Sequence, residues 1–504
     1  EFLIKMIADG YTGRKGKGGF YRINRDNGGK VKEALDLKTG TYRTAEKSDR
    51  LACLGVSKQG LRTFVTFGDR GSKYAWSVLS KTLHYAASLV PEVADNLYAV
   101  DEAMRLGYNW KSGPFEMIDK LGPAWFAEQL KSQGQTVPAL VEKVGAGTFY
   151  KVDGGKTYYF TTKGTYEDVP RRPGVLLLRD IKLASKPIIK NASAALWDIG
   201  DGVVCFEFTG KQNSIDLDVI NLLEESIALV EKNYKGLVVH NEGSNFSAGA
   251  NLGLALFAAN VAAWDLIGDL VEKGQRVYQD LKHSNFPVVA APSGMALGGG
   301  CEIVLHSNAV QAHAETYIGL VEVGVGLIPA WGGCKEMLHR WLHEARGPGG
   351  AMVGIGKVFE MIGTAKVAKS AAEAQEMMLI RSTDSIVMNK DRLLYEAKQK
   401  VLEMAPNYVA PEKVEFNLPG GVARVAMNMA VKGFVKAGKA TPYDEEISKK
   451  LAYILSGGDT DITDREKEDD ILAMERSTFM GLIQDPRTLA RIEHILETGK
   501  PLRN

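Results

Sequence analysis

The 504-residue sequence has few cysteines, no long apolar run and almost no excess of charge of either sign. The cysteines are Cys53, Cys205, Cys301 and Cys334. No two of them form a Cys-x-x-Cys pair, so the pattern favours neither a zinc site nor a disulfide framework. No apolar run reaches the ~18 residues of a membrane-spanning helix. The formal net charge of +1 gives no argument for binding to nucleic acid or to a membrane. We therefore expect a protein of a reducing compartment, the cytoplasm.

Two cofactor signals are also missing. Gly354-Ile355-Gly356 lacks the third glycine and the preceding strand of a dinucleotide-binding turn. His339 and His343 share a helical face, but no carboxylate or cysteine nearby completes a set of metal ligands. We therefore expect neither a metal site nor a nucleotide cofactor bound by this chain.

The first third of the sequence has helical character. Residues 1–50 combine a basic, glycine-rich turn with a polar stretch that is typical of a loop. Residues 72–145 keep apolar side chains at a spacing of three to four, which predicts amphipathic helices interrupted at Gly113-Pro114. The segment at 145–150 echoes the Gly-Lys-Gly-Gly-Phe-Tyr segment at 16–21. This echo predicts two related helical units.

The remainder alternates between strand and helix patterns. A proline-containing connector at 161–190 includes a strand-like apolar run at 175–178. Strand patterns follow at 203–208, 236–240 and 287–291, and helical patterns at 220–231 and 260–283. Such alternation implies crossover connections and a largely parallel sheet. After about residue 390 the pattern is mostly helical, and the charge-rich stretch at 459–470 is predicted to be a solvated loop.

The segment with the most chemical content is a glycine-rich turn that runs into a glutamate, Gly298-Gly299-Gly300-Cys301-Glu302. It follows a predicted strand and begins a predicted helix, where N–H groups carry partial positive charge and can stabilise an oxyanion. The alternative is a tight turn in which Glu302 only favours the helix N-terminus. Cys301 has no neighbouring histidine to activate it, so we interpret it as a packing residue.

Two further segments extend this hypothesis. Glu322 lies in an apolar, glycine-rich context where burial would raise its pKa toward a range useful for proton transfer, although it could also be a structural carboxylate. The loop at 245–251 follows a predicted strand and is either an ordinary loop or the source of a second oxyanion N–H group. Two carboxylates can hold one water and move its protons. The three segments together predict a site that adds water beside a carbonyl.

The same three segments resemble the enoyl-CoA hydratase/isomerase (crotonase) superfamily. The motifs are Ala-Leu-Gly-Gly-Gly-Cys-Glu at 296–302, the Glu322 segment ending in Ile328-Pro329, and Ser-Ala-Gly-Ala at 247–250. They occur in the family's order and spacing. The resemblance implies that residues 191–390 form an α/β crotonase-like core, a repeated ββα superhelix, followed by a C-terminal helical region at 391–504.

By that resemblance, Ala250 and Gly299 would supply the oxyanion N–H groups, and Glu302 and Glu322 would be the catalytic acid/base pair. The substrate would be an acyl-CoA thioester, with binding residues Ala248, Gly249, Asn251, Gly298 and Lys211. Asn251 stands where many members carry aspartate, and Trp331 interrupts the usual run of small residues after the proline. These departures leave the acyl-chain preference open.

Two motif pairs mark residues 1–160: Gly13-Arg14-Lys15 with Gly18-Gly19-Phe20-Tyr21, and Asp101-Glu102-Ala103 with Gly113-Pro114-Phe115-Glu116. With these motifs, residues 1–160 resemble the mainly α-helical C-terminal domains of 3-hydroxyacyl-CoA dehydrogenases. Residues 1–50 resemble the end of one such domain and residues 51–160 a second, with 161–190 as a linker. This order resembles the bacterial bifunctional β-oxidation proteins in which the dehydrogenase precedes the hydratase. The Rossmann domain of that class is missing, so the resemblance implies a fragment without a cofactor of its own, NAD belonging to the full-length protein.

The expected function is therefore enoyl-CoA hydratase, which adds water to a 2-enoyl-CoA to give a 3-hydroxyacyl-CoA. One alternative is an isomerase on the same fold, which usually needs only one carboxylate. Another is a non-catalytic subunit that binds acyl-CoA or serves assembly. The expected partner is the acyl-CoA substrate, with no nucleic acid and no membrane span, and assembly into a homo-oligomer stays open.

Overall fold

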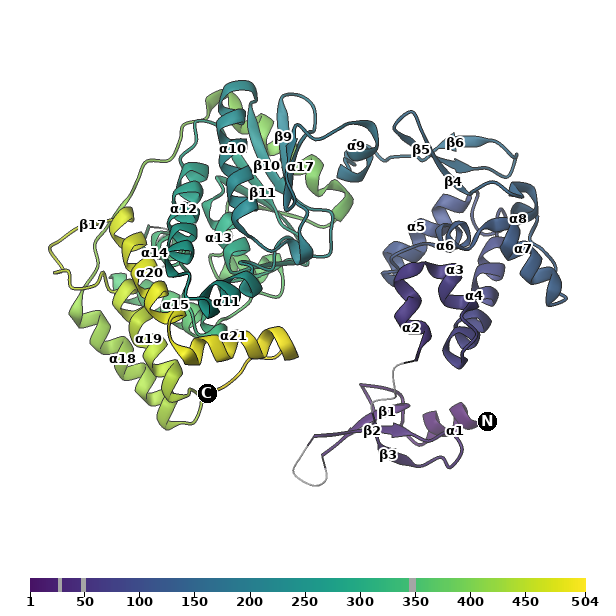
Figure 1. The fold of residues 1–504 in the computed structure, drawn as a ribbon, viewed down its shortest axis with the longest axis horizontal. Coiled ribbons are helices and arrows are strands. Elements are labelled where there is room, and N and C mark those ends of the chain that lie inside the picture. Colours follow the sequence, from purple (N-terminus) through teal and green to yellow (C-terminus); the bar gives the residue numbers. More distant parts are fainter. Residues whose placement is uncertain (26–29, 47–50, 344–349) are drawn as a thin grey trace. The chain divides into compact units, whose positions relative to one another are not determined.

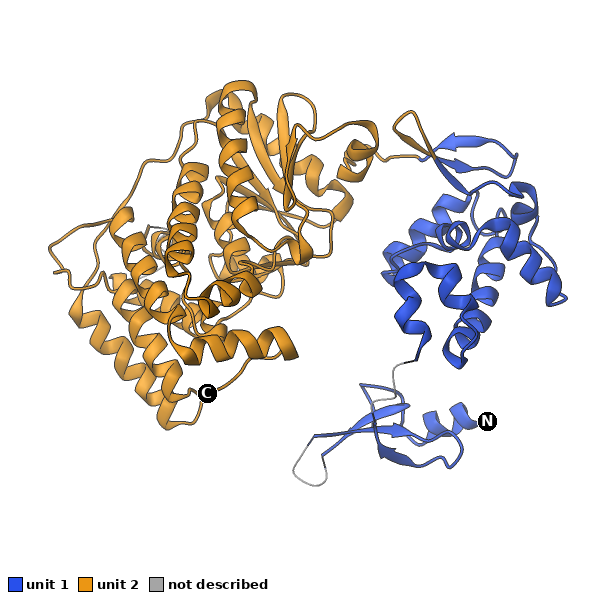
Figure 2. Cartoon of the chain, in the orientation of Figure 1, with its two compact units in different colours: residues 1–151, 158–169 blue, residues 152–157, 170–504 orange. Residues whose placement is uncertain are grey.

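The structure, a computed structural model, describes residues 1–25, 30–46, 51–343 and 350–504 (Figure 1). These residues form two compact units (Figure 2). Unit 1 comprises residues 1–151 and 158–169, and unit 2 comprises residues 152–157 and 170–504. Each unit has an apolar core of its own. None of the helices in the described residues has both the length and the apolar character of a membrane span.

The polar stretch near the start of unit 1, predicted to be a loop, is a sheet. Helix α1 (Phe2–Ala8) precedes antiparallel strands β1 (Tyr21–Asn24), β2 (Val31–Leu35) and β3 (Tyr42–Thr44). The Arg22 guanidinium pairs with Glu33 on the next strand at 2.6 Å and lies 4.0 Å from the centroid of the Tyr42 ring. Cross-strand polar and cation–π contacts therefore hold this sheet, which is why no apolar alternation marks it in the sequence.

The predicted helices between residues 72 and 145 are confirmed. They are α4 (Arg70–Ser88), α5 (Leu97–Tyr108), α6 (Pro114–Leu121), α7 (Pro123–Ser132) and α8 (Ala139–Val144), after the short α2 (Cys53–Val56) and α3 (Leu61–Thr66). Asp101 is fully buried and accepts hydrogen bonds from Phe115 N at 2.8 Å and from the Tyr150 hydroxyl at 2.9 Å. Burial raises the pKa of Asp101 to about 7. This carboxyl joins α5, the start of α6 and the strand that follows α8.

The echo between segments 16–21 and 145–150 has a structural counterpart. Each copy follows a helix, α1 or α8, and each leads into a three-stranded sheet. The second sheet has the order β4 (Tyr150–Asp153), β5 (Lys156–Phe160), β6 (Tyr166–Asp168). The tyrosine of each copy, Tyr21 or Tyr150, begins the first strand. The repeated element is thus a helix, a glycine turn and a small sheet, whereas the sequence predicted purely helical units.

A seven-stranded sheet forms the centre of unit 2, in the order β15-β13-β11-β10-β9-β8-β7. Its strands are β7 (Ile189–Lys190), β8 (Ala194–Asp198), β9 (Val203–Phe208), β10 (Gly236–His240), β11 (Val288–Ala291), β13 (Ala309–His313) and β15 (Ser385–Val387). The pairs from β9 to β15 are parallel, and β7–β8 and β8–β9 are antiparallel. The largely parallel sheet predicted from the sequence is confirmed.

Helices pack on both faces of this sheet. Along β9, Val204 and Phe206 belong to the core formed with α10 (Leu217–Asn233) and α12 (Trp264–Lys282), which are labelled in Figure 1. The alternate residue Cys205 belongs to a second cluster with α17 (Leu393–Met404). All five residues of β10 are buried. A strand that is covered on both faces has a continuous apolar sequence, and β10 has such a sequence.

The strand-like run at 175–178 is not a strand. Its last residue, Leu178, begins helix α9 (Leu178–Ala184) and is fully buried. The Glu242 carboxylate accepts hydrogen bonds from the N–H groups of Leu178 and Arg179, the latter at 2.9 Å. A carboxylate from a distant loop therefore caps this helix, which local sequence does not reveal.

The chain beyond residue 390 is mostly helical, as predicted. After α17 come α18 (Gly421–Lys436), α19 (Pro442–Leu455), α20 (Glu468–Ile483) and α21 (Pro486–Thr498), with a small antiparallel pair, β16 (Glu415–Phe416) and β17 (Glu466–Lys467). The prediction of a solvated loop over 459–470 is wrong at its end, where Glu468 starts α20 and is 1% exposed.

Glu468 belongs to a buried cluster of four charges, with Lys282, Lys335 and Glu336. Lys282 Nζ lies 2.7 Å from Glu336 and 3.1 Å from Glu468. Lys335 Nζ also pairs with both carboxylates. Two positive and two negative charges therefore compensate each other between α12, α14 (Gly333–His343) and α20. Each charge is taken out of water only because its partners are present.

Candidate active site

The loop that follows β10 and the segment around β12 are distant in sequence but lie side by side. Strand β12 (Met295–Leu297) pairs in parallel with β14 (Tyr317–Gly319), and on its other side it meets Ser247. Ser247 N donates to Met295 O at 2.9 Å, and Leu297 N donates to Ser247 O at 3.0 Å. This short parallel pairing places the turn after β12 directly beside the loop that follows β10.

The predicted glycines stand where the main chains approach most closely. A Cβ on Gly249, whose φ is +90°, would lie 2.7 Å from Leu297 O and 3.3 Å from Gly299 N. A Cβ on Gly298, whose φ is +54°, would lie 3.1 Å from Glu322 Oε1. Both the backbone conformation and the available space therefore require glycine at these two positions.

The N–H groups of Ala250 and Gly299 lie on these adjacent turns. Among the described residues, neither donates to a main-chain acceptor. Ile215 bonds to the residues on either side of Ala250, through Gly249 O and Asn251 N. Gly299 is the first residue of α13 (Gly299–His306), so its N–H precedes the intrahelical bonds. The pair can serve as the oxyanion donors that the sequence predicted.

Glu302 lies one turn into α13 and is 2% exposed. Its Oε1 accepts hydrogen bonds from Trp331 N and Gly333 N, both at 2.8 Å. Burial raises the pKa of Glu302 to about 7, while these two N–H groups favour the ionised form. Because Gly333 is the first residue of α14, the carboxylate also lies at the positive end of that helix.

Glu322 has a different environment. It starts the short 3-10 turn η3 (Glu322–Val325) after β14, and its Oε2 is buried without a hydrogen-bond partner. Burial, followed by the charge of Glu302, raises the pKa of Glu322 well above its ordinary value. The two glutamates are therefore close enough to influence each other's ionisation.

A third buried carboxyl, Glu475 on α20, was not predicted. It is 0% exposed and accepts hydrogen bonds from Gly332 N at 2.8 Å and Lys335 N at 2.9 Å. Burial and the charge of Glu302 raise its pKa to about 8. The available sequence signal was its spacing from Ile471, which places a glutamate on the apolar face of a helix.

The Trp331 ring packs against the turn at Gly298 and Gly299. A Cβ on Gly299 would lie 2.5 Å from Cζ3 of this ring, and Gly274 of α12 also faces the ring closely. The Tyr278 hydroxyl donates to Gly299 O at 3.1 Å, and the Tyr278 and Trp331 rings are 5.6 Å apart. The aromatic residue that departs from the family pattern is thus packed against the turn, and it leaves no room for a side chain at Gly299.

The predicted substrate-binding residues follow the same loops. Ala248 N donates to Gln212 O at 3.2 Å, so this loop is bonded to the turn η2 (Lys211–Asn213) that carries the exposed Lys211. The Asn251 side chain accepts a hydrogen bond from Leu254 N at 3.2 Å and caps α11 (Leu252–Asn260). The structure therefore brings the predicted residues together, with a helix-capping role for Asn251 that the sequence did not indicate.

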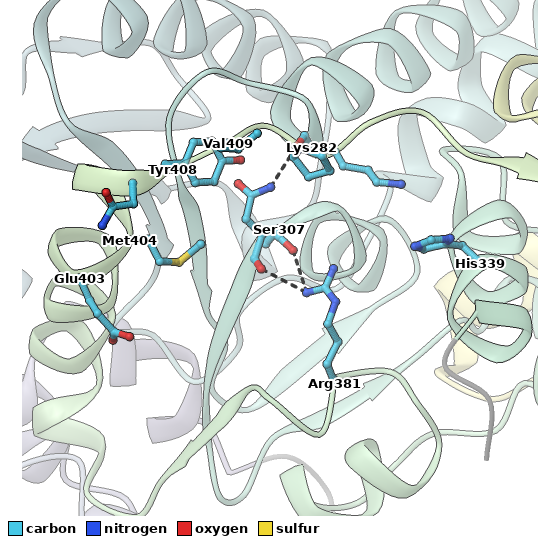
Figure 3. A pocket seen from close by; sticks show the side chains of 11 residues that line it. Lys282, Ser307, His339, Arg381, Glu403, Met404, Tyr408 and Val409 are labelled. Atoms are coloured by element: carbon cyan, nitrogen blue, oxygen red, sulfur yellow. Dashed lines mark hydrogen bonds between the residues drawn. The ribbon is translucent and has the colours of Figure 1, made fainter. Parts of the chain in front are cut away.

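A separate pocket contains none of these residues (Figure 3). It is lined by side chains that include Lys282, Ser307, His339, Arg381 and Tyr408. Arg381 donates to the carbonyls of Ser307 and Asn308 at 3.2 and 3.4 Å, and burial lowers the pKa of His339 to about 4. Ser307 lies just before the amino end of β13. Glu302 and Glu322, in contrast, follow the carboxyl ends of β12 and β14.

Comparison with known proteins agrees with this arrangement. Residues 199–410 match the model of the family Enoyl-CoA hydratase/isomerase. This stretch contains both the glycine turn and the glutamate pair. The second half of the chain therefore contains a domain of the enoyl-CoA hydratase/isomerase type, and the α/β crotonase-like fold class predicted from the sequence is confirmed.

Two curated relatives extend over the whole chain. One is "Probable 3-hydroxyacyl-CoA dehydrogenase" of Bacillus subtilis, 37% identical over 100% of this chain and 64% of that protein. Another is "Putative fatty acid oxidation complex trifunctional enzyme" of Rickettsia felis, 29% identical over 98% of this chain and 62% of that protein. The chain thus spans less than two thirds of the length of these relatives.

Solved structures cover a part of the chain. An enoyl-CoA hydratase from Bacillus halodurans is 16% identical over 60% of this chain and 100% of its own, with a TM-score of 0.41. An enoyl-CoA hydratase/isomerase from Mycobacterium paratuberculosis is 19% identical over 60% of this chain and 98% of its own, also with a TM-score of 0.41.

Proposed function

We propose that unit 2 is an enoyl-CoA hydratase, which adds water to a 2-enoyl-CoA thioester and forms a 3-hydroxyacyl-CoA. The observation that carries this proposal is the pair of coupled, buried carboxyls, Glu302 and Glu322, beside two turns with unused N–H groups. Hydration needs one group that takes a proton from water and one that gives a proton to carbon. It also needs donors for the thioester oxygen, on which negative charge develops.

We infer the roles of the two carboxyls from their environments. Glu302 is held by two N–H donors at the start of α14, which favours its ionised form, so it acts as the base that accepts a proton from water. Glu322 has an enclosed, unpartnered oxygen and a raised pKa, so it acts as the acid. The water oxygen bonds to the β-carbon of the substrate, and Glu322 then transfers its proton to the α-carbon.

The oxyanion donors act between these two proton transfers. The N–H groups of Ala250 and Gly299 would donate to the thioester oxygen and stabilise the enolate that precedes protonation of carbon. One such donor is typically worth about 3–4 kcal/mol of transition-state stabilisation. After the reaction Glu302 carries the extra proton and Glu322 has lost one, so exchange with solvent restores both groups.

The relatives' names support a place for this reaction in fatty-acid oxidation. We infer that the 3-hydroxyacyl-CoA product is oxidised by an NAD-dependent dehydrogenase within a longer protein, to which unit 1 would contribute helical segments. The printed names of the Bacillus and Rickettsia relatives, a 3-hydroxyacyl-CoA dehydrogenase and a fatty acid oxidation complex enzyme, motivate this proposal. We place the protein in the cytoplasm, in agreement with four buried cysteines that are all free thiols.

One assay separates the candidate functions. Crotonyl-CoA loses its enoyl-thioester absorbance when hydrated, whereas a 3-enoyl-CoA gains that absorbance when isomerised. We expect rapid loss with crotonyl-CoA and little change with the 3-enoyl substrate. The opposite pattern would establish the isomerase, and binding of both thioesters with no absorbance change would establish a non-catalytic acyl-CoA-binding protein.

A further inference from the structure

Two carboxylates divide the N–H groups of one short loop between them. Along residues 331–335, Trp331 N and Gly333 N donate to Glu302, and Gly332 N and Lys335 N donate to Glu475. The four distances are 2.8, 2.8, 2.8 and 2.9 Å. Two N–H groups of the loop therefore point toward the proposed catalytic base and two point toward α20.

This loop is also the start of a helix. Gly333 begins α14, so the N–H groups of its first turn have no partners within the helix. Glu302 and Glu475 both supply acceptors there and both gain from the positive end of the helix dipole. The position of the Glu302 carboxylate thus depends on a loop whose other side is fixed by a residue more than one hundred positions away.

Glycine makes this double attachment possible. A Cβ on Gly333 would lie 3.0 Å from Glu302 Oε1, and a Cβ on Gly332, whose φ is +96°, would lie 2.8 Å from the buried His306 ring. The loop is therefore closely packed at both glycines, and a displacement at Glu475 would be expected to shift the two donors of Glu302 as well.

The charged and titratable groups that face Glu475 come from three elements. Glu302 on α13 raises its pKa, and Lys335 on α14 lowers it. Glu475 in turn raises the pKa of Glu322 on η3 and that of the Cys334 thiol. Ionisation of Glu475 is therefore coupled to both proposed catalytic carboxyls, and not only to the loop.

We propose that Glu475 is a positioning residue for the hydration reaction: from helix α20 it fixes the 331–335 loop, which aims the Glu302 carboxylate at the reacting water. This inference rests on the proposed function. It places a functional residue in the C-terminal helical region, beyond residue 410, where the family match ends. Glu475 does not touch the reacting atoms and acts through the main chain of the loop.

The first test substitutes Glu475 and compares it with a matched control. In Glu475→Gln, one end of the amide would present donors to a main-chain N–H, so the loop loses one attachment, and above the Glu475 pKa of about 8 the site loses one negative charge. We expect kcat to fall by roughly 10²-fold with KM little changed, as a small misplacement of a catalytic group can cause. Loss of the Glu475 charge lowers the pKa of Glu322, so the alkaline limb of the kcat–pH profile should move to lower pH.

Glu468→Gln is the control. Glu468 is on the same helix and is also buried, but it bonds to the Nζ atoms of Lys282 and Lys335 in the charge cluster and not to the main chain of the loop. It should lower the melting temperature and leave the kcat–pH profile in place. If Glu475→Gln does not fold, Glu475→Asp keeps the charge but shortens the reach, and it should lower kcat without moving the profile. Normal kcat in the folded variant would overturn the proposal.

A second readout does not depend on turnover. Infrared difference spectra of the carboxyl C=O stretch report the titration of buried carboxyls in the whole protein. Glu475→Gln should remove one band and move the midpoints of the bands that belong to Glu302 and Glu322. Failure of the wild type to hydrate crotonyl-CoA would refute the proposed function, while unmoved midpoints would refute the coupling through Glu475 whether or not the protein hydrates.

Discussion

Gly298 and Glu322 face each other across the proposed site: a Cβ at Gly298 would lie 3.1 Å from Glu322 Oε1. Gly298 also has a φ of +54°, which L side chains rarely adopt. The glycine that turns the chain into α13 therefore also leaves the space in which the second carboxyl stands. The glycine-rich turn at 298–302 and the Glu322 segment are therefore parts of one packing arrangement.

This relationship leads to the first prediction. Gly298→Ala should displace the Glu322 carboxyl and lower kcat at least 10-fold, a change of about 1.4 kcal/mol in the activation free energy. Gly268→Ala is the control, because Gly268 lies within helix α12 and a Cβ there would lie no closer than 3.8 Å to a neighbouring atom. That control should keep kcat and gain up to about 1 kcal/mol of stability. Equal kcat values in the two variants would contradict the prediction.

The glutamate pair itself gives the second prediction. Glutamine is nearly the same size as glutamate but cannot exchange a proton, so Glu302→Gln and Glu322→Gln should each lower kcat by ~10²–10⁴-fold. The double variant should be little worse than the poorer single variant, because the two groups act as a unit. Measuring kcat and melting temperature on the same samples separates this outcome from a purely structural role. Normal hydration by Glu322→Gln would favour a one-carboxylate isomerase.

The third prediction concerns stability and pH. Burial raises the pKa of Glu302 from 4.5 to about 7, so the folded state binds this proton more tightly than the unfolded state. The contribution is present below pH 4.5 and is lost as the pH rises through about 7. The difference in unfolding free energy between wild type and Glu302→Gln should therefore shrink, or change sign, from pH 5 to pH 8. Denaturant titrations at both pH values measure it, and a difference that grows with pH would contradict the assignment.

The fourth prediction tests Lys211. It lies on an exposed turn bonded to the 245–251 loop, and a cation there would meet a phosphate group of the thioester. Lys211→Ala should raise KM several-fold and leave kcat unchanged, and the effect should fade at high salt because exposed charges are screened. Lys232→Ala, an exposed lysine on α10, is the control. An unchanged KM would show that Lys211 does not contact the substrate.

The fifth prediction concerns NAD. Gly354-Ile355-Gly356 lies inside helix α15 (Gly350–Gly363), so its N–H groups are not the free donors of a phosphate-binding turn. We expect no saturable binding of NADH at micromolar concentration, followed by its fluorescence, while crotonyl-CoA binds the same sample. Tight NADH binding would mean that a nucleotide site exists in this chain.

Local patterns predicted those parts of the fold that local forces determine. The run at 203–208 and the glycine turn at 298–302 carry their signals within a few residues, and both appear as predicted. The sheet β1–β3 gave no such signal because Arg22 and Tyr42, not an apolar face, hold it. Glu475 could not be predicted as a site residue, because its importance comes from a loop that only the tertiary fold brings to α20.

The compensated charges of Lys282, Lys335, Glu336 and Glu468 set a lower limit on the segment that can fold as unit 2. The family match ends at residue 410, yet a chain cut there would retain both lysines with only one of their two carboxylate partners. An unbalanced charge in that interior costs several kcal/mol, comparable with the whole stability of many domains. The helices after residue 410 are therefore a structural requirement of unit 2, and expression of residues 191–410 alone should yield insoluble or unfolded protein.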